Sequence, residues 1–205
     1  PLPGSERLPR PSPSGIRAAA RLLGRWGRVL VIAGLGCRRS GAGRALQKLV
    51  EHLGAPVLTT LRAKGALSED HPLSAGVLAG GRPEEDLLSK AEGILAVGLD
   101  PIELLPRSWQ VGPPIVTLTE YAPSGWPSDP ACELLADLPT SLEAVREALP
   151  PGGGWGLAAW AANGREFRLR MRALLAEAST AKGRAGVAPH RVVELAREIF
   201  PRQTI

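Results

Sequence analysis

The chain has 205 residues, of which 44% are hydrophobic and 22% are charged. This composition is ordinary for a globular protein and argues against wholesale disorder or a fibrous repeat. The formal net charge of +5 comes mainly from arginines, which are scattered along the chain with no aromatic side chains interleaved among them, so we expect solvated faces and no nucleic-acid partner.

The cysteine content and the hydropathy pattern favour a cytoplasmic protein. Cys37 and Cys132 fit neither a disulfide framework nor the spacing of a zinc site. There is no secretory hydrophobic segment and no apolar run of about 18 residues that could span a bilayer, so we expect no membrane partner. Because the chain begins with Pro1 and contains a single methionine, we also expect it to be a segment excised from a longer protein.

The chain opens with a proline-rich segment and then forms its first helix and strand. Five prolines within residues 1 to 15 predict an extended linker, because proline removes backbone donors and disfavours helix. Residues 16 to 27 carry apolar side chains at helical spacing. The run "RVLVIAG" (28 to 34) is typical of a parallel strand that is buried on both faces.

Helices and strands then alternate. Residues 41 to 53 predict a helix that Gly54 ends, and "APVLTTL" (55 to 61) predicts the next strand, joined by a right-handed crossover. The later elements are a sixth strand or irregular crossover within 65 to 82, a helix at 83 to 93, strands at 94 to 98, 114 to 119 and 132 to 138, and a helix at 141 to 149. This alternation predicts an α/β fold with a Rossmann-like, doubly wound, mostly parallel six-stranded sheet and helices on both faces.

The sequence after the "PPGGG" break lies outside the sheet pattern. It predicts two helices, from about Leu157 to Ala181 and over 188 to 200. We therefore divide the chain into a linker (1 to 15), a Rossmann-like domain (16 to 150), and a helical segment (151 to 205) that leads into a neighbouring domain.

The glycine-rich turn after the first strand is the clearest candidate binding feature. Gly34 and Gly36 stand where a dinucleotide fold needs glycine for a tight turn and a close backbone approach to a pyrophosphate. Arg39 replaces the third glycine of G-x-G-x-x-G, and the second strand does not end in an acidic residue that would bind a ribose. The pattern alone favours a structural turn, with nucleotide binding as the alternative.

The sequence does not suggest a reaction centre. His52, His71 and His190 have no partners at metal or triad spacing, so polar surface roles are expected. Nucleophile-elbow, zinc-protease and P-loop motifs are absent. The five tryptophans are expected to be core or interface anchors.

Asp100 and Glu103 follow the strand at 94 to 98. They stand at the edge where open α/β sheets place ligands. We favour a turn with a helix cap at Asp100 over a ligand site, because aspartate suits that role.

Three stretches in order, "RVLVIAGLG", "LVEHLGAPVLTTLRAKGALSEDHPLSAG" and "AEGILAVGLDPIELLP", make the chain resemble one known family. They are similar to the central domain of thiamine-diphosphate-dependent enzymes of the acetolactate synthase and 2-oxo acid decarboxylase family. Residues 54 to 76 are the most specific part, and the resemblance covers about residues 11 to 149. "GVAPHRVVELAREIFP" resembles the segment that opens the family's C-terminal cofactor domain.

The resemblance implies that the chemistry belongs to other domains. In the family, a glutamate of the N-terminal domain activates the thiazolium, and a G-D-G…N stretch of the C-terminal domain holds magnesium and diphosphate. Neither is found here. The resemblance thus implies no catalytic residue and no metal ligand in this chain. It implies flanking domains as partners, thiamine diphosphate and Mg²⁺ as cofactors of the parent enzyme, and a homodimer or homotetramer.

Some family members hold FAD or ADP in this domain. By resemblance, the corresponding positions of this chain form a vestigial nucleotide site. They are Gly34, Gly36, Thr60, Leu61, Arg62, Gly76 and Gly98, with Asp100 in place of the family's arginine. Thr119 stands where nucleotide-binding members usually carry an aspartate. Because a carboxylate facing a pyrophosphate would repel it, we expect no bound FAD or ADP.

Two hypotheses follow. The first is a central structural domain of a cytoplasmic thiamine-diphosphate-dependent lyase or synthase acting on 2-oxo acids, without turnover on its own. The alternative is a stand-alone module of the same fold that binds FAD, NAD or ADP.

Overall fold

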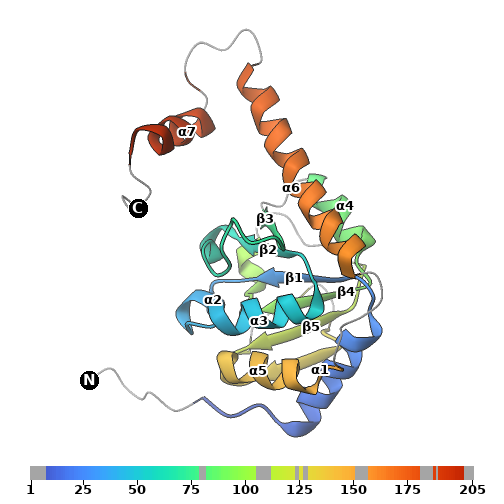
Figure 1. Ribbon diagram of the computed structural model, residues 1–205. Coiled ribbons are helices and arrows are strands. Elements are labelled where there is room, and N and C mark those ends of the chain that lie inside the picture. The colour runs from blue at the N-terminus through green and yellow to red at the C-terminus, as the bar shows by residue number, and fades with distance from the viewer. Residues whose placement is uncertain are drawn as a thin grey trace, which may run out of the picture.

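The computed structural model contains one sheet of six strands in the order β3-β2-β1-β4-β5-β6, and every pairing is parallel (Figure 1). The strands are β1 (Val29–Ala33), β2 (Val57–Thr60), β3 (Ser74–Leu78), β4 (Gly93–Val97), β5 (Ile115–Thr119) and β6 (Cys132–Leu135). The structure describes residues 8–78, 82–104, 112–122, 125–126, 129–150, 157–180, 187 and 189–200. The order reverses between β1 and β4, which is the switch point of a doubly wound sheet, so the predicted Rossmann-like fold is confirmed.

The central strands are buried along their whole length. Every residue of β1, β4 and β5 is buried, because helices cover both faces of the sheet. The segment at 65 to 82, where the sequence left a strand or an irregular crossover open, contains β3. The register between β2 and β3 shifts at Val57 and Leu58, and Gly76 within β3 has φ +113°. This irregularity explains why no regular strand pattern is visible in the sequence there.

Helices form a layer on each face of the sheet. The described helices are α1 (Pro13–Arg25), α2 (Gly36–Arg39), α3 (Gly43–Leu53), α4 (Arg82–Lys90), α5 (Leu138–Ala148), α6 (Leu157–Thr180) and α7 (Pro189–Ile199), with one-turn helices η1 (Leu61–Ala63) and η2 (Pro101–Leu104). One layer contains α1, α3 and α5, and the other contains α4 and the first half of α6 (Figure 1). None of the described helices combines the length and the apolar content needed to cross a membrane.

Two predicted boundaries are corrected by local capping. Helix α1 begins at Pro13, inside the segment predicted as linker, because the Ser12 side chain accepts a hydrogen bond from the Gly15 amide at 3.1 Å. Helix α5 begins at Leu138 rather than at 141, because Asp137 caps the amide of Thr140 at 2.9 Å. That cap also ends β6 earlier than predicted.

The first half of α6 packs on the sheet, although the sequence placed this segment outside the sheet pattern. Trp160 is 1% exposed, and its indole Nε1 donates to the Val29 carbonyl oxygen at 2.6 Å. Phe167 is also buried in this layer. The expectation of a helical segment separate from the sheet is therefore corrected for this half of the helix, and Trp160 is the core anchor that the sequence suggested.

Candidate functional site

The glycine turn and the end of β4 meet at the carboxyl edge of the two central strands. The amide of Gly34 donates to the Val97 carbonyl at 2.9 Å, and the amide of Gly36 donates to the Gly98 carbonyl at 2.8 Å. In Figure 1 the arrow of β1 ends at α2, which marks this edge. Three of the residues assigned to the nucleotide site by resemblance, Gly34, Gly36 and Gly98, are thus brought together.

These glycines are required by contact between two backbones. A Cβ on Gly36 would lie 2.7 Å from the Gly98 Cα, and a Cβ on Gly98 would lie 2.7 Å from the Cys37 amide nitrogen. Gly98 also has φ +54°, a conformation that favours glycine. The space that Gly36 and Gly98 leave open is filled by each other's main chain.

A carboxylate lies directly over the turn. Both Glu103 oxygens lie 3.1 Å from the Leu35 amide nitrogen, which donates to them. The Thr60 hydroxyl donates to Glu103 Oε2 at 2.6 Å, and the Asp100 amide donates to Glu103 Oε1 at 3.2 Å. We call these three donors, on Leu35, Thr60 and Asp100, the cradle. Leu35 follows β1, Asp100 follows β4, and Thr60 is the last residue of β2.

Asp100 acts as the turn residue that the sequence favoured. Its Oδ1 accepts from the Ile102 amide at 3.0 Å, which caps the one-turn helix η2. This helix brings Glu103 back over the glycine turn. Asp100 itself contributes its backbone amide to the cradle.

The other sequence-predicted residues lie outside the cradle. Leu61 is 68% exposed at the start of η1, and Arg62 is exposed beside it, with its carbonyl oxygen 3.4 Å from Arg38 Nη1. Gly76 lies within β3, two strands away from β1, and no atom lies within 4 Å of a Cβ placed on it. Thr119 is buried, and its hydroxyl donates to the Tyr121 carbonyl at 2.9 Å.

Two carboxylates at this edge, those of Asp100 and Glu103, act on the neighbouring Tyr121, and the charge of Arg39 acts in the opposite direction. Partial burial, followed by the charges of Asp100 and Glu103, raises the pKa of Tyr121 from 10.0 to about 12. Burial raises the pKa of Cys37 from 9.0 to about 12, and its thiol donates to the Val97 carbonyl at 3.1 Å. Cys37 is thus a buried hydrogen-bonded side chain with little thiolate character.

His52 and His71 each contact one neighbouring group. His52 Nε2 lies 3.1 Å from the Pro150 carbonyl oxygen, and His71 Nε2 lies 3.1 Å from Glu51 Oε1. The pKa of Glu51 is lowered, first by a hydrogen bond from Gln47 and then by one from His71. Throughout the part of the chain that the structure describes, no three His, Cys, Asp or Glu side chains are grouped so that they could hold a metal ion. His190 lies in α7.

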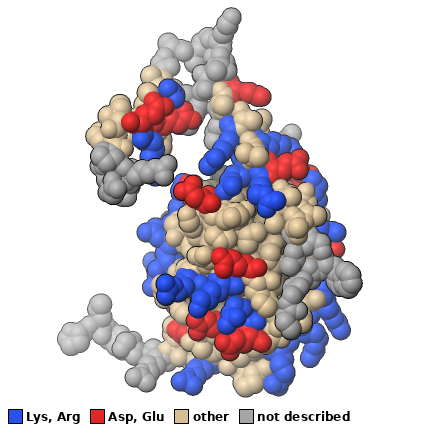
Figure 2. Space-filling view, viewed as in Figure 1, with Lys and Arg blue, Asp and Glu red and all other residues tan. Residues whose placement is uncertain are grey.

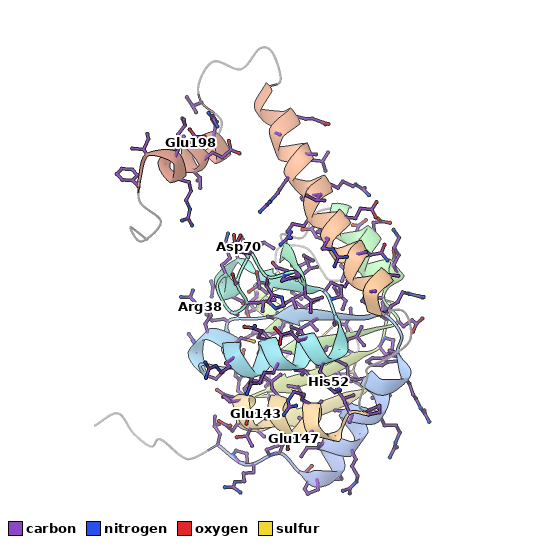
Figure 3. All side chains as sticks on the ribbon, in the orientation of Figure 1. Arg38, His52, Asp70, Glu143, Glu147 and Glu198 are labelled. Carbon is purple, nitrogen blue, oxygen red and sulfur yellow. The ribbon has the colours of Figure 1, made fainter. Side chains whose placement is uncertain are left out.

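The described surface carries charged side chains of both signs. Arg38 projects from α2 at the cradle edge, whereas His52 lies near the opposite end of α3 (Figure 3). On the face in Figure 2, Lys and Arg side chains are interspersed with Asp and Glu side chains. An open groove of about 430 Å³ lies between α1 and the end of α5, and is lined by Arg17, Ala20, Arg21, Gly24, Arg25, Ala148 and Pro150.

Glu103 is the site residue that sequence reasoning left out of the nucleotide site. The sequence placed it at the correct edge, next to Asp100, but assigned it no partner. The available signal was its position three residues after Asp100, with Pro101 between them, since one turn of 3-10 helix returns the side chain over the preceding strand end.

A comparison with family models matches residues 16–123 to one described as "Thiamine pyrophosphate enzyme, central domain". A protein named "probable acetolactate synthase large subunit", from Methanococcus aeolicus, is 40% identical over 88 residues, which make up 42% of this chain and 15% of that protein. The 2-hydroxyacyl-CoA lyase of Oryza sativa subsp. japonica is 48% identical over 61 residues, which make up 30% of this chain and 11% of that protein.

Among solved structures, the benzoylformate decarboxylase from Polynucleobacter necessarius superposes with a TM-score of 0.68 and 19% sequence identity. The match covers 96% of this chain and 35% of that chain. At this identity the likeness shows the fold alone. The matched regions thus form a minor part of each of these larger proteins.

Proposed function

We propose a function from one premise: this chain belongs to the thiamine pyrophosphate enzyme family through its central domain. The proposed function is that of the central structural domain of a lyase or synthase acting on 2-oxo acids. The observation that carries this proposal is the family match over residues 16–123, which spans the sheet from β1 to β5. The name of one relative supports the substrate class, because acetolactate synthase denotes chemistry on 2-oxo acids.

The residues described here do not fit thiamine diphosphate and Mg²⁺. Within the described residues, no three His, Cys, Asp or Glu side chains are grouped so that they could hold a metal ion. The carboxyl edge of the central strands carries Glu103, a negative side chain, over the glycine turn. We therefore propose that other domains of the enzyme bind the cofactor, whose thiazolium supplies an electron sink when bound.

In this proposal the chain positions its neighbours. Flanking domains of the same polypeptide and further subunits of a homodimer or homotetramer are its partners, and the cytoplasm is its compartment. Support comes from α7 and the residue that follows it, where Val192, Val193, Ile199 and Phe200 are 54%, 63%, 72% and 55% exposed. A neighbouring domain would cover such a row of apolar side chains.

The test compares this chain with the product of the longest reading frame that contains it. Each is supplied with thiamine diphosphate, Mg²⁺ and a panel of 2-oxo acids that includes pyruvate and benzoylformate, and CO₂ release is measured. We expect release from the longer product alone. CO₂ release by this chain alone would contradict the proposal that other domains carry the catalytic residues. If the longer product released no CO₂ from any of the acids, the proposed substrate class would be contradicted.

The alternative of a stand-alone nucleotide-binding module has no support from the comparisons. The relatives and the solved structure named above are large enzymes, of which this chain matches a minor part. No contact in the cradle favours the alternative either, since its donors are paired with Glu103.

A further inference from the structure

The cradle presents to Glu103 the kinds of donor that dinucleotide folds present to a phosphate. Such folds hold a pyrophosphate with backbone amides of the turn after the first strand. Here the Leu35 amide of that turn donates to both Glu103 oxygens. The Thr60 hydroxyl and the Asp100 amide complete a set of donors around one anionic group. Hydrogen bonds to a charged acceptor are stronger than those between neutral groups.

The carboxylate also takes the space above the turn. A Cβ placed on Gly34 would lie 2.4 Å from the Gly98 carbonyl oxygen and from the Leu99 Cα, and 2.8 Å from Glu103 Oε1, so the main chain after β4 and the glutamate together fill the space beside this glycine. On the other side of the turn, Gly36 is covered by the Gly98 main chain. Little of the turn backbone remains for a phosphate to approach.

The carboxylate charges at this edge, like the filled space above the turn, oppose the approach of a diphosphate. Glu103 and Asp100 are three residues apart in one turn, and both raise the pKa of the neighbouring Tyr121. A diphosphate brought to this edge would face two carboxylates at short range, and like charges repel most strongly where water is partly excluded. Arg38 and Arg62 lie nearby, and the Arg38 guanidinium donates to the Arg62 carbonyl oxygen.

We propose that Glu103 is an internal anion that takes the position of a nucleotide phosphate, joins the end of β2 to the segments after β1 and β4, and closes this cradle to ADP and FAD. The inference concerns a site that the proposed catalytic function does not use. Measurements on this chain alone test the inference, and the activity of a longer enzyme does not affect their outcome.

The first experiment tests whether the cradle accepts an external anion once the internal one is removed. Thermal unfolding of Glu103→Ala is followed in sodium formate and in sodium chloride of equal ionic strength. Formate supplies a carboxylate of the required charge, so we expect it to raise the melting temperature of Glu103→Ala by about 2 to 4 °C above the chloride value. The wild-type chain and Asp100→Ala, which both keep Glu103, should show no such difference. An equal response of all three, or none in Glu103→Ala, would overturn the proposal.

A second experiment uses the isosteric change Glu103→Gln, which remains informative if Glu103→Ala fails to fold. The amide proton resonances of Leu35 and Asp100 are compared between the wild type and Glu103→Gln, with Glu85→Gln on α4 as the control. Loss of the charged acceptor should move both resonances upfield in Glu103→Gln and leave them in place in the control. Unmoved resonances would overturn the proposal.

Calorimetric titration of the wild-type chain with ADP and with FAD completes the test. We expect no binding up to millimolar nucleotide, because the cradle is filled. Micromolar binding of either nucleotide would show an open cradle and would overturn the proposal. Absence of thiamine-diphosphate chemistry in any longer protein would leave these three results unchanged.

Discussion

The Thr60 hydroxyl donates to Glu103 Oε2 at 2.6 Å, and this contact joins the end of β2 to the turn after β4. Thr60 Oγ1 also accepts from the Ala63 amide at 3.2 Å, which caps η1. One hydroxyl therefore serves two segments.

Replacing this hydroxyl should weaken the fold. Thr60→Val keeps the branched shape but removes the donor to Glu103 and the acceptor for Ala63. Because both partners then lose a hydrogen bond in a buried setting, we expect the free energy of unfolding to fall by about 1 to 3 kcal/mol. Urea unfolding measures the change, with the exposed Glu85→Gln on α4 as the control, whose effect should stay within about 0.5 kcal/mol. Equal effects of the two changes would contradict the role given to Thr60.

A methyl group at Gly36 should be poorly tolerated. Its Cβ would lie 2.7 Å from the Gly98 Cα, and backbone cannot move aside as a side chain can. We expect Gly36→Ala to lower the free energy of unfolding by about 1 to 3 kcal/mol or more. In Gly112→Ala the added methyl group meets no atom within 4 Å, so this variant should unfold as the wild type does. A stable Gly36→Ala chain in thermal unfolding would show that the two backbones are not in close contact.

The two cysteines should differ in reactivity. Burial raises the pKa of Cys37 to about 12, and burial followed by the charge of Glu133 raises the pKa of the half-buried Cys132. A disulfide reagent should modify Cys37 at least about tenfold more slowly than Cys132 at pH 8, because the thiolate is the reacting form and Cys37 is shielded from solvent. Cys37→Ala and Cys132→Ala assign the two rates. Faster reaction at Cys37 would be inconsistent with its burial.

Tyr121 is the single tyrosine of the chain, so its ionisation can be followed by absorbance. We expect a pKa of about 12, raised first by partial burial and then by Asp100 and Glu103. Glu103→Gln should lower this pKa toward 10.0, because it removes one of the two charges. Glu85→Gln serves as the control and should leave the titration unchanged. A titration that is identical in Glu103→Gln and the wild type would argue against a charged Glu103 near this ring.

The raised pKa of Tyr121 also sets the sign of its effect on stability. The folded chain retains the phenolic proton after the unfolded chain has lost it. The contribution of Tyr121 to stability is therefore present below about pH 10 and is lost as the pH rises toward 12.

The indole of Trp160 should be essential for docking α6 on the sheet. Trp160→Phe keeps most of the ring but leaves the Val29 carbonyl without its donor, so we expect a loss of about 1 to 3 kcal/mol in the free energy of unfolding. Trp160→Ala should cost about 3 to 5 kcal/mol, because a cavity is added. Leu169→Ala, at a position 62% exposed on the same helix, is the control and should cost little. If Trp160→Phe matched Leu169→Ala in urea unfolding, the indole hydrogen bond would not contribute.

The strands of the sheet were predictable because each central strand is buried on both faces and therefore appears as an uninterrupted apolar run. The helices were predictable from apolar side chains at helical spacing, as in α3, and the turn from Gly34 and Gly36. Boundaries were less predictable, since Ser12 and Asp137 each cap a helix earlier than the apolar pattern indicates.

The sequence by itself determined the parallel α/β architecture, the glycine turn and the family, because these depend on local composition and on the order of short motifs. Tertiary structure alone decided what fills the turn. Glu103 meets donors 68 and 43 residues earlier in the chain, and Trp160 meets a carbonyl 131 residues earlier. Local spacing carries no information about such pairs, because only the packing of the strands and their helices brings the partners within hydrogen-bond distance.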